Sequence, residues 1–176
     1  AAMPGMLPKI GLALGPNKTL VLTLPNKLAD LMGERVEKRL QGLAAGCLGE
    51  ILAECLKQAG GRSADVGDVV VAGNTVMQHL LLGVTPEHIA MSPFAPVFAQ
   101  MRSIPAAEIG LPAAPGAILT VMPAVSGYVG GDIVAGLLAT QLLDDDDAGP
   151  VLFIDIGTNG EIVLVHEGKA TSCSTA

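Results

Sequence analysis

The segment Asp155-Ile156-Gly157-Thr158-Asn159-Gly160-Glu161 decides the fold expected for this chain. It follows the apolar run 151–154 and precedes the apolar run 162–165, so two strands are expected to meet at this turn. Asp155 ends the first strand, and its carboxylate can reach Mg²⁺ through water, because Mg²⁺ favours oxygen ligands and keeps part of its hydration shell. The backbone of residues 157–160 can turn its N–H groups toward an anion. The segment therefore predicts a phosphate loop beside a metal position.

A plain β-hairpin is the alternative interpretation of the same segment. Asn159-Gly160 is the strongest two-residue signal for a hairpin turn between two strands. A hairpin alone does not account for an acid at the end of an apolar strand, or for Thr158 beside Gly157. The local sequence leaves the two interpretations about equally supported, because short motifs also match by chance.

The composition predicts a soluble, cytoplasmic protein of one domain or two small lobes. The chain has 176 residues, and 50% of them are hydrophobic, which is enough for a sizeable core. The formal net charge of −7 argues against a nucleic-acid partner, since such a partner favours a basic surface. No apolar run reaches the roughly 18 residues of a membrane span, and the N-terminus has no signal-peptide pattern, so no membrane partner is expected.

The cysteines and histidines do not form a metal motif in the sequence. Cys47, Cys55 and Cys173 contain no Cys-x-x-Cys pair, and the first two are expected to be small buried hydrophobes on one helix. The three histidines, at 79, 88 and 166, lie in separate elements without ligand spacing. We expect each of them at the surface or partly buried.

The first 65 residues predict two short strands and a long helix. The strands are expected at 10–14 and 19–24, and the helix is expected from about residue 27 to 59, with a break at Gly33 and a stop at Gly60-Gly61. Glycines 42, 46 and 49 lie along one side of this helix. They indicate either close approach of another element or mere tolerance, although an interior glycine costs about 1 kcal/mol relative to alanine.

Two βα units are expected between residues 66 and 149. The run 68–72 predicts a central parallel strand, after which Gly73-Asn74-Thr75 begins a helix, either as an ordinary N-cap or as an anion site. A second strand is expected at 117–122, followed by a glycine-rich loop that ends in Gly130-Gly131-Asp132 and a second helix. Asp132 suits the helix dipole and could also serve a metal or a ligand hydroxyl. Five prolines between 93 and 115 exclude one continuous element there.

These blocks resemble a known family. Residues 155–161 look like the first phosphate loop of the acetate and sugar kinase, Hsc70 and actin superfamily. Three further blocks, at 73–83, 126–132 and 172–176, narrow the resemblance to the ATP-dependent reductive activators of corrinoid proteins, which are fused to a ferredoxin domain. The resemblance implies an α/β fold, a ribonuclease H-like (actin-like ATPase) mixed sheet flanked by helices, present here in part. Regions are expected at 1–65, 66–149 and 150–176, the last being the start of a next lobe.

The resemblance also implies a function and its cofactors. Such activators return cob(II)alamin to cob(I)alamin, using ATP and Mg²⁺ and an electron from a [2Fe–2S] domain. The partner would be a corrinoid iron–sulfur protein or a corrinoid methyltransferase, and a homodimer stays open. The metal position would be Asp155, through water, and the residues expected to line the nucleotide phosphates are Asp155, Gly157, Thr158, Asn159, Gly160, Glu161, Gly73, Asn74, Thr75, Gly130, Gly131 and Asp132.

The chain departs from the family pattern at three places. It carries no cysteine pattern for the iron–sulfur domain, an earlier acidic loop near residue 15 is replaced by Gly15-Pro16-Asn17-Lys18, and the chain ends at Ala176, before a second lobe. We therefore expect a fragment with little or no ATPase activity. Two alternatives remain at this stage: a structural or partner-binding module with degenerate nucleotide loops, and a small-molecule kinase of the same superfold.

Overall fold

The computed structural model describes residues 13–14, 20–21, 29–144, 149–157 and 159–175. The chain divides into two compact units, Ala1–Gly33 and Glu34–Ala176. In the first unit, β1 (Ala13–Leu14) pairs antiparallel with β2 (Leu20–Val21), which lie within the two predicted strands. The remainder of those predicted strands lies outside the described residues. The other elements lie in the second unit, except for the start of α1, which begins at Ala29.

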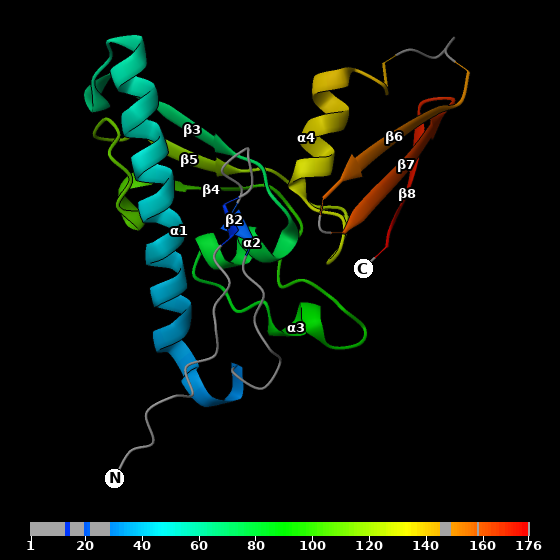
Figure 1. Ribbon diagram of the computed structural model, residues 1–176, viewed down its shortest axis with the longest axis horizontal. Coiled ribbons are helices and arrows are strands. Elements are labelled where there is room, and N and C mark those ends of the chain that lie inside the picture. Colours follow the sequence, from blue (N-terminus) through cyan, green and yellow to red (C-terminus); the bar gives the residue numbers. More distant parts are fainter. Residues whose placement is uncertain (1–12, 15–19, 22–28, 145–148, 158, 176) are drawn as a thin grey trace. The chain divides into compact units, whose positions relative to one another are not determined.

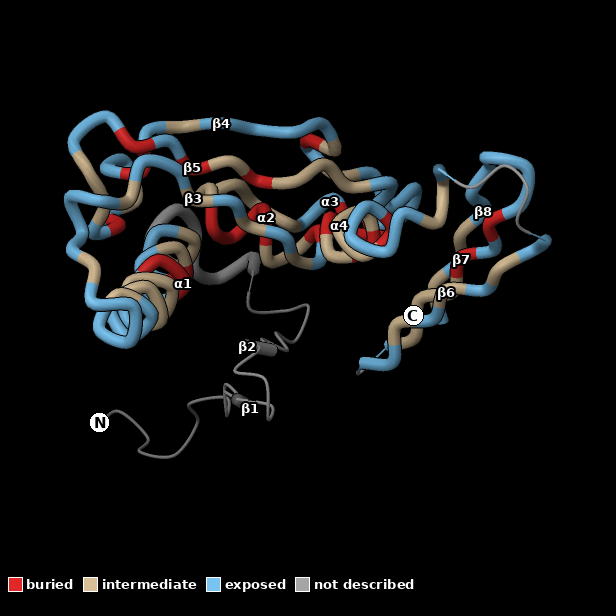
Figure 2. Tube along the Cα trace, turned by 90° about the horizontal axis from the view of Figure 1, so that it is seen from above, coloured by how far each residue is buried: buried red, intermediate tan, exposed pale blue. Residues whose placement is uncertain are grey.

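The first sheet of this unit is mixed and has β5 at its centre (Figure 1). The strand order is β3 (Asp68–Val71), β5 (Ile118–Val121) and β4 (Arg102–Pro105), with β3 parallel and β4 antiparallel to β5. Leu119 and Val121 of β5 are fully buried, and parts of the β5 tube in Figure 2 are coloured as buried. The prediction of β3 as a central strand was wrong, because β4 pairs on the far side of β5 and the proline-rich sequence had concealed that strand. Within the described residues β3 lies at the sheet edge, and Val70 is exposed.

The long helix α1 (Ala29–Ala59) covers this sheet through Ala44, which belongs to the same buried cluster as Leu119 and Val121. The helix ends as predicted: Gly60 has φ +66°, and the Gly61 N–H donates to the Leu56 carbonyl at 2.9 Å. The predicted break at Gly33 was wrong, because α1 runs through that position. A single glycine costs only about 1 kcal/mol in a helix, which a long packed helix can absorb.

The idea of close approach along the α1 glycines holds for one of the three. A Cβ on Gly42 or Gly46 would meet nothing within 4 Å, whereas a Cβ on Gly49 would lie 3.4 Å from Cδ of Pro112. The interpretation as mere tolerance therefore applies to Gly42 and Gly46. Cys55 is exposed rather than buried, because the apolar stripe of α1 is wider than the face that the sheet covers.

Shorter elements connect these parts. Helix α2 (Thr75–Leu81) follows β3, and helix α4 (Gly131–Thr140) follows β5, as the two predicted βα units require. The intervening segments contain α3 (Glu87–Ala90) and the 3₁₀ turns η1 (Ser63–Asp65) and η2 (Ala106–Ile109). None of the helices in the described part of the chain is both long and apolar enough to cross a bilayer.

The second sheet is the predicted antiparallel meander. It consists of β6 (Val151–Ile156), β7 (Gly160–His166) and β8 (Lys169–Ser174), in that order. Helix α4 packs against one face, where Ile133 and Leu137 form a buried cluster with Val163 and Val165. Parallel and antiparallel strands flanked by helices confirm the mixed α/β class.

Candidate functional site

Two of the predicted loops are joined directly to each other. The Gly73 carbonyl, at the end of β3, accepts hydrogen bonds from the N–H groups of Gly131 (2.9 Å) and Asp132 (3.3 Å) at the start of α4. Gly130 lies against the same backbone, since a Cβ there would come within 2.5 Å of the Asn74 Cα and 2.7 Å of the Gly73 oxygen. The two βα units therefore meet where their strands end, which is where open α/β sheets bind ligands.

Asn74 and Thr75 hold this junction together. The Asn74 Oδ1 accepts from the Met77 N–H at 2.9 Å, so Asn74 is the N-cap of α2, as one of the two predicted alternatives requires. Thr75 is 1% exposed, and its Oγ1 donates to the Ser126 carbonyl at 2.6 Å. The first turn of α2 is thereby fastened to the glycine-rich loop that precedes α4.

We expect Thr75→Val to lower the free energy of unfolding by about 1–2 kcal/mol, because the isosteric side chain leaves the Ser126 carbonyl without its donor. Urea unfolding measures the change. Thr140→Val is the matched control: the Thr140 Oγ1 donates to the Gly136 carbonyl of its own helix on the exposed side, so its loss is expected to cost less than about 0.5 kcal/mol. Equal losses in the two variants would contradict a special role for the Thr75 bond.

Asp132 is a partly buried acid in the first turn of α4. Gly130 occupies the N-cap position, and the Asp132 Oδ1 accepts from the Ile133 N–H at 3.0 Å. Burial raises the pKa of Asp132 above its ordinary value of 3.8, the backbone N–H groups of Ile133 and of Asp132 itself lower this pKa, and the negative charge of Asp155 raises it further. The charge of Asp155 therefore acts on Asp132, and Phe153 of the same strand packs against α4, since a Cβ on Gly136 would lie 2.6 Å from its Cζ.

The Asp155 segment forms a hairpin turn one residue longer than the Asn-Gly signal predicts. Asp155 pairs with Glu161 and Ile156 with Gly160 in the ladder, so the turn comprises residues 157–159, of which Thr158 lies outside the described residues. Neither Gly157 nor Gly160 has a positive φ. The hairpin and the predicted loop are thus the same structure, and its glycines are not required by backbone geometry.

Several predicted anion donors already have protein acceptors. The Gly157 N–H donates to the Asn159 carbonyl (3.0 Å), and the Gly160 N–H donates to Oγ1 of Thr175 (2.8 Å). The N–H groups of Gly131 and Asp132 donate to Gly73, as described above. A phosphate bound directly by these amides would have to displace those acceptors.

Three residues of the site were missed by sequence reasoning. Thr175 forms two hydrogen bonds with Gly160: its Oγ1 accepts from the Gly160 N–H, and its own N–H donates to the Gly160 carbonyl at 2.9 Å. Gln78, 2% exposed, donates from Nε2 to the Met122 carbonyl at 2.8 Å and touches Gly131. Ser126 accepts from Thr75. The sequence indicates that the blocks 126–132 and 172–176 matter, but only the strand register and the helix packing show which of their atoms form these hydrogen bonds.

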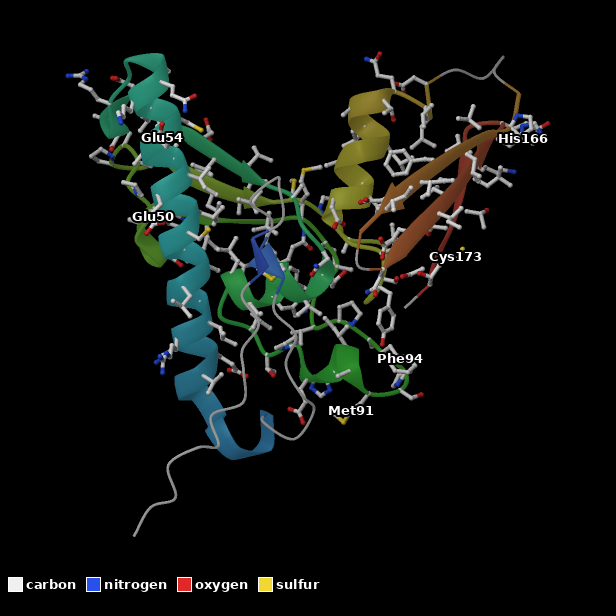
Figure 3. All side chains as sticks on the ribbon, in the orientation of Figure 1. Glu50, Glu54, Met91, Phe94, His166 and Cys173 are labelled. Carbon is white, nitrogen blue, oxygen red and sulfur yellow. The ribbon has the colours of Figure 1, made fainter. Side chains whose placement is uncertain are left out.

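Asp132 and Asp155 are the carboxylates that could hold a magnesium ion, whereas the cysteines do not fit an iron–sulfur cluster. Asp132 and Asp155 raise each other's energy when both are ionised, and a divalent cation would relieve that repulsion. The described residues contain no group of three acids, histidines or cysteines, so water and ligand oxygens would complete the shell, as Mg²⁺ allows. The three cysteines lie apart, on α1 and β8, and do not form the four-thiolate site of a [2Fe–2S] cluster (Cys173 is labelled in Figure 3).

Comparison with known proteins identifies the family of this chain. Residues 29–145 match the family model described as the RACo middle region. This chain belongs to the RACo middle region family. The corrinoid activation enzyme RamQ of Eubacterium limosum is 35% identical over 129 residues, which cover 73% of this chain and 21% of RamQ. A solved structure, described as a reductive activator for corrinoid, iron-sulfur protein, matches with a TM-score of 0.77 and 33% identity over 85% of this chain.

Membership of the RACo middle region family confirms the resemblance stated from the sequence blocks, and the structural match confirms the fold expected from it. The chain spans about a fifth of the length of these two proteins, 21% of RamQ and 23% of the solved activator.

Proposed function

We propose that this chain is the middle part of an ATP-dependent activator that reduces the cobalt of a corrinoid protein. The proposal draws on the family and on the two relatives whose descriptions name corrinoid activation. The observation that carries it is the hydrogen-bonded junction of the loops at Gly73 and Asp132, with the charge of Asp155, at the end of β6, acting on Asp132. Binding of a charged ligand at this junction would change the position of its loops.

In this proposal the two carboxylates carry Mg²⁺, and the metal carries the nucleotide phosphates. Asp155 ends β6 and Asp132 begins α4, so a bound cation would tie the second sheet to the helix that packs on it. The start of α4 adds the positive end of the helix dipole beside the phosphates. Metal-mediated binding agrees with the amides of Gly131 and Gly157 being already engaged.

The electron in this proposal comes from a [2Fe–2S] domain outside this chain. One electron converts Co(II) to Co(I), and the partner is a corrinoid iron–sulfur protein or a corrinoid methyltransferase. What this chain contributes is the nucleotide-dependent arrangement of its loops, since neither its cysteines nor its few aromatic side chains form a redox centre in the described part.

A chimera tests the proposal. The segment of RamQ that aligns with this chain, 129 residues in length, is replaced by the corresponding residues of this chain. We expect ATP-dependent formation of Co(I), monitored by its visible absorption, at a rate within about tenfold of that of RamQ, since the two segments are 35% identical. A RamQ variant lacking the segment is the control and is expected to be inactive. A folded chimera that binds Mg-ATP and never forms Co(I) would contradict the corrinoid role.

A second candidate is a partner-binding module whose nucleotide loops serve folding only. The observation in its favour is that the amides of Gly131, Asp132, Gly157 and Gly160 all donate to protein acceptors. The chimera distinguishes the two candidate functions. If the chain is only a partner-binding module, substitution of Asp132 or Asp155 in the chimera should leave the rate of Co(I) formation unchanged.

A further inference from the structure

His79 is the most deeply buried ionisable side chain of the described residues, with 0% exposure. The prediction that it would be superficial or partly buried was wrong, because the last turn of α2 faces the segment 91–101 rather than solvent. Its Nδ1 lies 2.7 Å from the Thr75 carbonyl, one turn back in α2, and its Nε2 accepts from the Val97 N–H at 3.1 Å. The ring stacks on Phe98 with a centroid distance of 4.2 Å and an angle of 13°.

These contacts determine the tautomer. The Val97 N–H is a donor, so Nε2 must be the unprotonated nitrogen. The Thr75 carbonyl is an acceptor, so Nδ1 must carry the proton. Both ring nitrogens are then satisfied in the neutral form. A second proton on Nε2 would point at the Val97 N–H and break that bond, leaving a cation in a buried site.

Besides its bond to His79, the segment 91–101 is held to residues outside it by the Ala99 carbonyl, which accepts from the Ala124 N–H at 2.8 Å. It contains no charged residue, and its exposed side chains include Met91, Phe94 and Val97 (Met91 and Phe94 are labelled in Figure 3). Phe94 has φ +61°, an uncommon conformation for a bulky residue, and its carbonyl lies so close to Gly127 that a Cβ there would approach it to 2.6 Å. The segment thus rests on both α2 and the glycine-rich loop of the candidate site.

No carboxylate compensates a charge on His79. Helix α2 has no other ionisable side chain. Burial lowers the pKa of His79 and the hydrogen bond to the Thr75 carbonyl raises it, whereas no charged group of α1 or of a neighbouring element in the described residues shifts it. The stack on Phe98 would by itself favour a cation, and burial outweighs it. The ionisable groups of the adjoining elements are Glu87 and His88 of α3, Tyr128, whose hydroxyl donates to the Ile89 carbonyl, and Arg102 of β4, 5.5 Å from the Phe98 ring centre.

We propose that His79 is a neutral latch: it ties the segment 91–101 to the first turn of α2, and its protonation releases that segment. Release exposes the apolar side chains of 91–101 further, whereas the bond from Nδ1–H to the Thr75 carbonyl remains, because Nδ1 keeps its proton. The latch acts independently of the proposed nucleotide and corrinoid chemistry, so it can be tested on this chain alone.

The pH direction follows from linkage. Burial lowers the pKa of His79 below its ordinary value of 6.5, so the open state takes up a proton more readily than the closed one. The closed state is therefore fully favoured above pH 6.5. Below pH 6.5, the ratio of closed to open molecules falls by up to tenfold for each pH unit, until the pH reaches the lowered pKa of His79.

Nuclear magnetic resonance of the unmodified chain provides the first test, because only three histidines contribute signals. Nitrogen-15 shifts of the rings are expected to show the Nδ1–H form for His79 at pH 7.5, and a titration midpoint for His79 below the ordinary 6.5. An Nε2–H form, or a midpoint at or above 6.5, would overturn the latch.

Hydrogen exchange provides the second test. The protection factor of the Val97 amide, corrected for intrinsic rates, is expected to fall by up to about thirtyfold from pH 7.5 to 5, while that of Leu119 in β5 stays constant. His79→Phe keeps the ring stack and removes both nitrogens, so Val97 should be weakly protected at every pH. If Val97 protection in the unmodified chain did not change with pH, the proposal would be wrong whether or not the variant folds.

Discussion

Gly130→Ala is expected to lower the free energy of unfolding by about 2–3 kcal/mol, the usual cost of forcing a methyl group into a packed position. The backbone of Gly130, φ −86° and ψ −173°, is open to any residue, so strain in φ and ψ plays no part. The cost comes from contact alone: the new Cβ would lie 2.5 Å from the Asn74 Cα and 2.7 Å from the Gly73 oxygen. Both are backbone atoms, so neither can rotate away as a flexible side chain would.

The matched control for this substitution is Gly46→Ala. A Cβ on Gly46, inside α1, meets no atom within 4 Å, so the change should stabilise the chain by about 0.5–1 kcal/mol through helix propensity. Chemical unfolding of the two variants gives both values. Opposite signs are expected, and a Gly130→Ala variant as stable as the parent would show that the loops at Gly73 and Gly130 are not held as closely as the structure describes.

Asp155→Asn is expected to weaken binding of a divalent cation at least about tenfold, or roughly 1.4 kcal/mol. The amide keeps the shape of the carboxylate and removes its charge, so the fold should persist. Mn²⁺ is a suitable probe, because it prefers oxygen ligands as Mg²⁺ does and can be followed by electron paramagnetic resonance in a titration of the chain.

A second measurement on Asp155→Asn does not depend on any ligand. The charge of Asp155 raises the pKa of Asp132, so its removal should lower that pKa, measured from the carboxyl carbon-13 shift. Glu50→Gln, an exposed change on α1 (Figure 3), controls for net charge and should alter neither quantity. If the Asp132 pKa fell and metal binding did not change, the proximity of the two carboxylates would be supported and the metal site would be rejected. If neither quantity changed, both the proximity and the metal site would be rejected.

Local pattern was a good guide to elements that contain their own signals. The helix stop at Gly60-Gly61 and the two strand–glycine–helix units around Asn74 and Asp132 were predicted from sequence and are present. The meander of β6–β8 was predicted as well. In each case the residues that define the element are neighbours in the chain, so periodicity and turn chemistry suffice.

The misses share a different cause. Strand β4 lies in a proline-rich segment and exists because its backbone pairs with Thr120 and Leu119, residues that are remote in sequence. The burial of His79 follows from the position of Val97 and Phe98, some 18 residues later. The turn after Asp155 is one residue longer than its Asn-Gly signal, because strand register, not the dipeptide, decides where pairing stops.

The sequence by itself determined the mixed α/β class, the order of the βα units and the family, since these depend on spacing along the chain and on short blocks in a fixed order. Only the tertiary structure decided that the Gly73 carbonyl meets the start of α4 at Asp132, that Thr75 and Thr175 fasten the loops, and that a neutral histidine ties down the segment beside them. The reason is physical: hydrogen bonds, charge repulsion and steric contact act through space over a few ångströms, and residues that lie dozens of positions apart in the sequence are brought within that range only by the packing of helices on sheets.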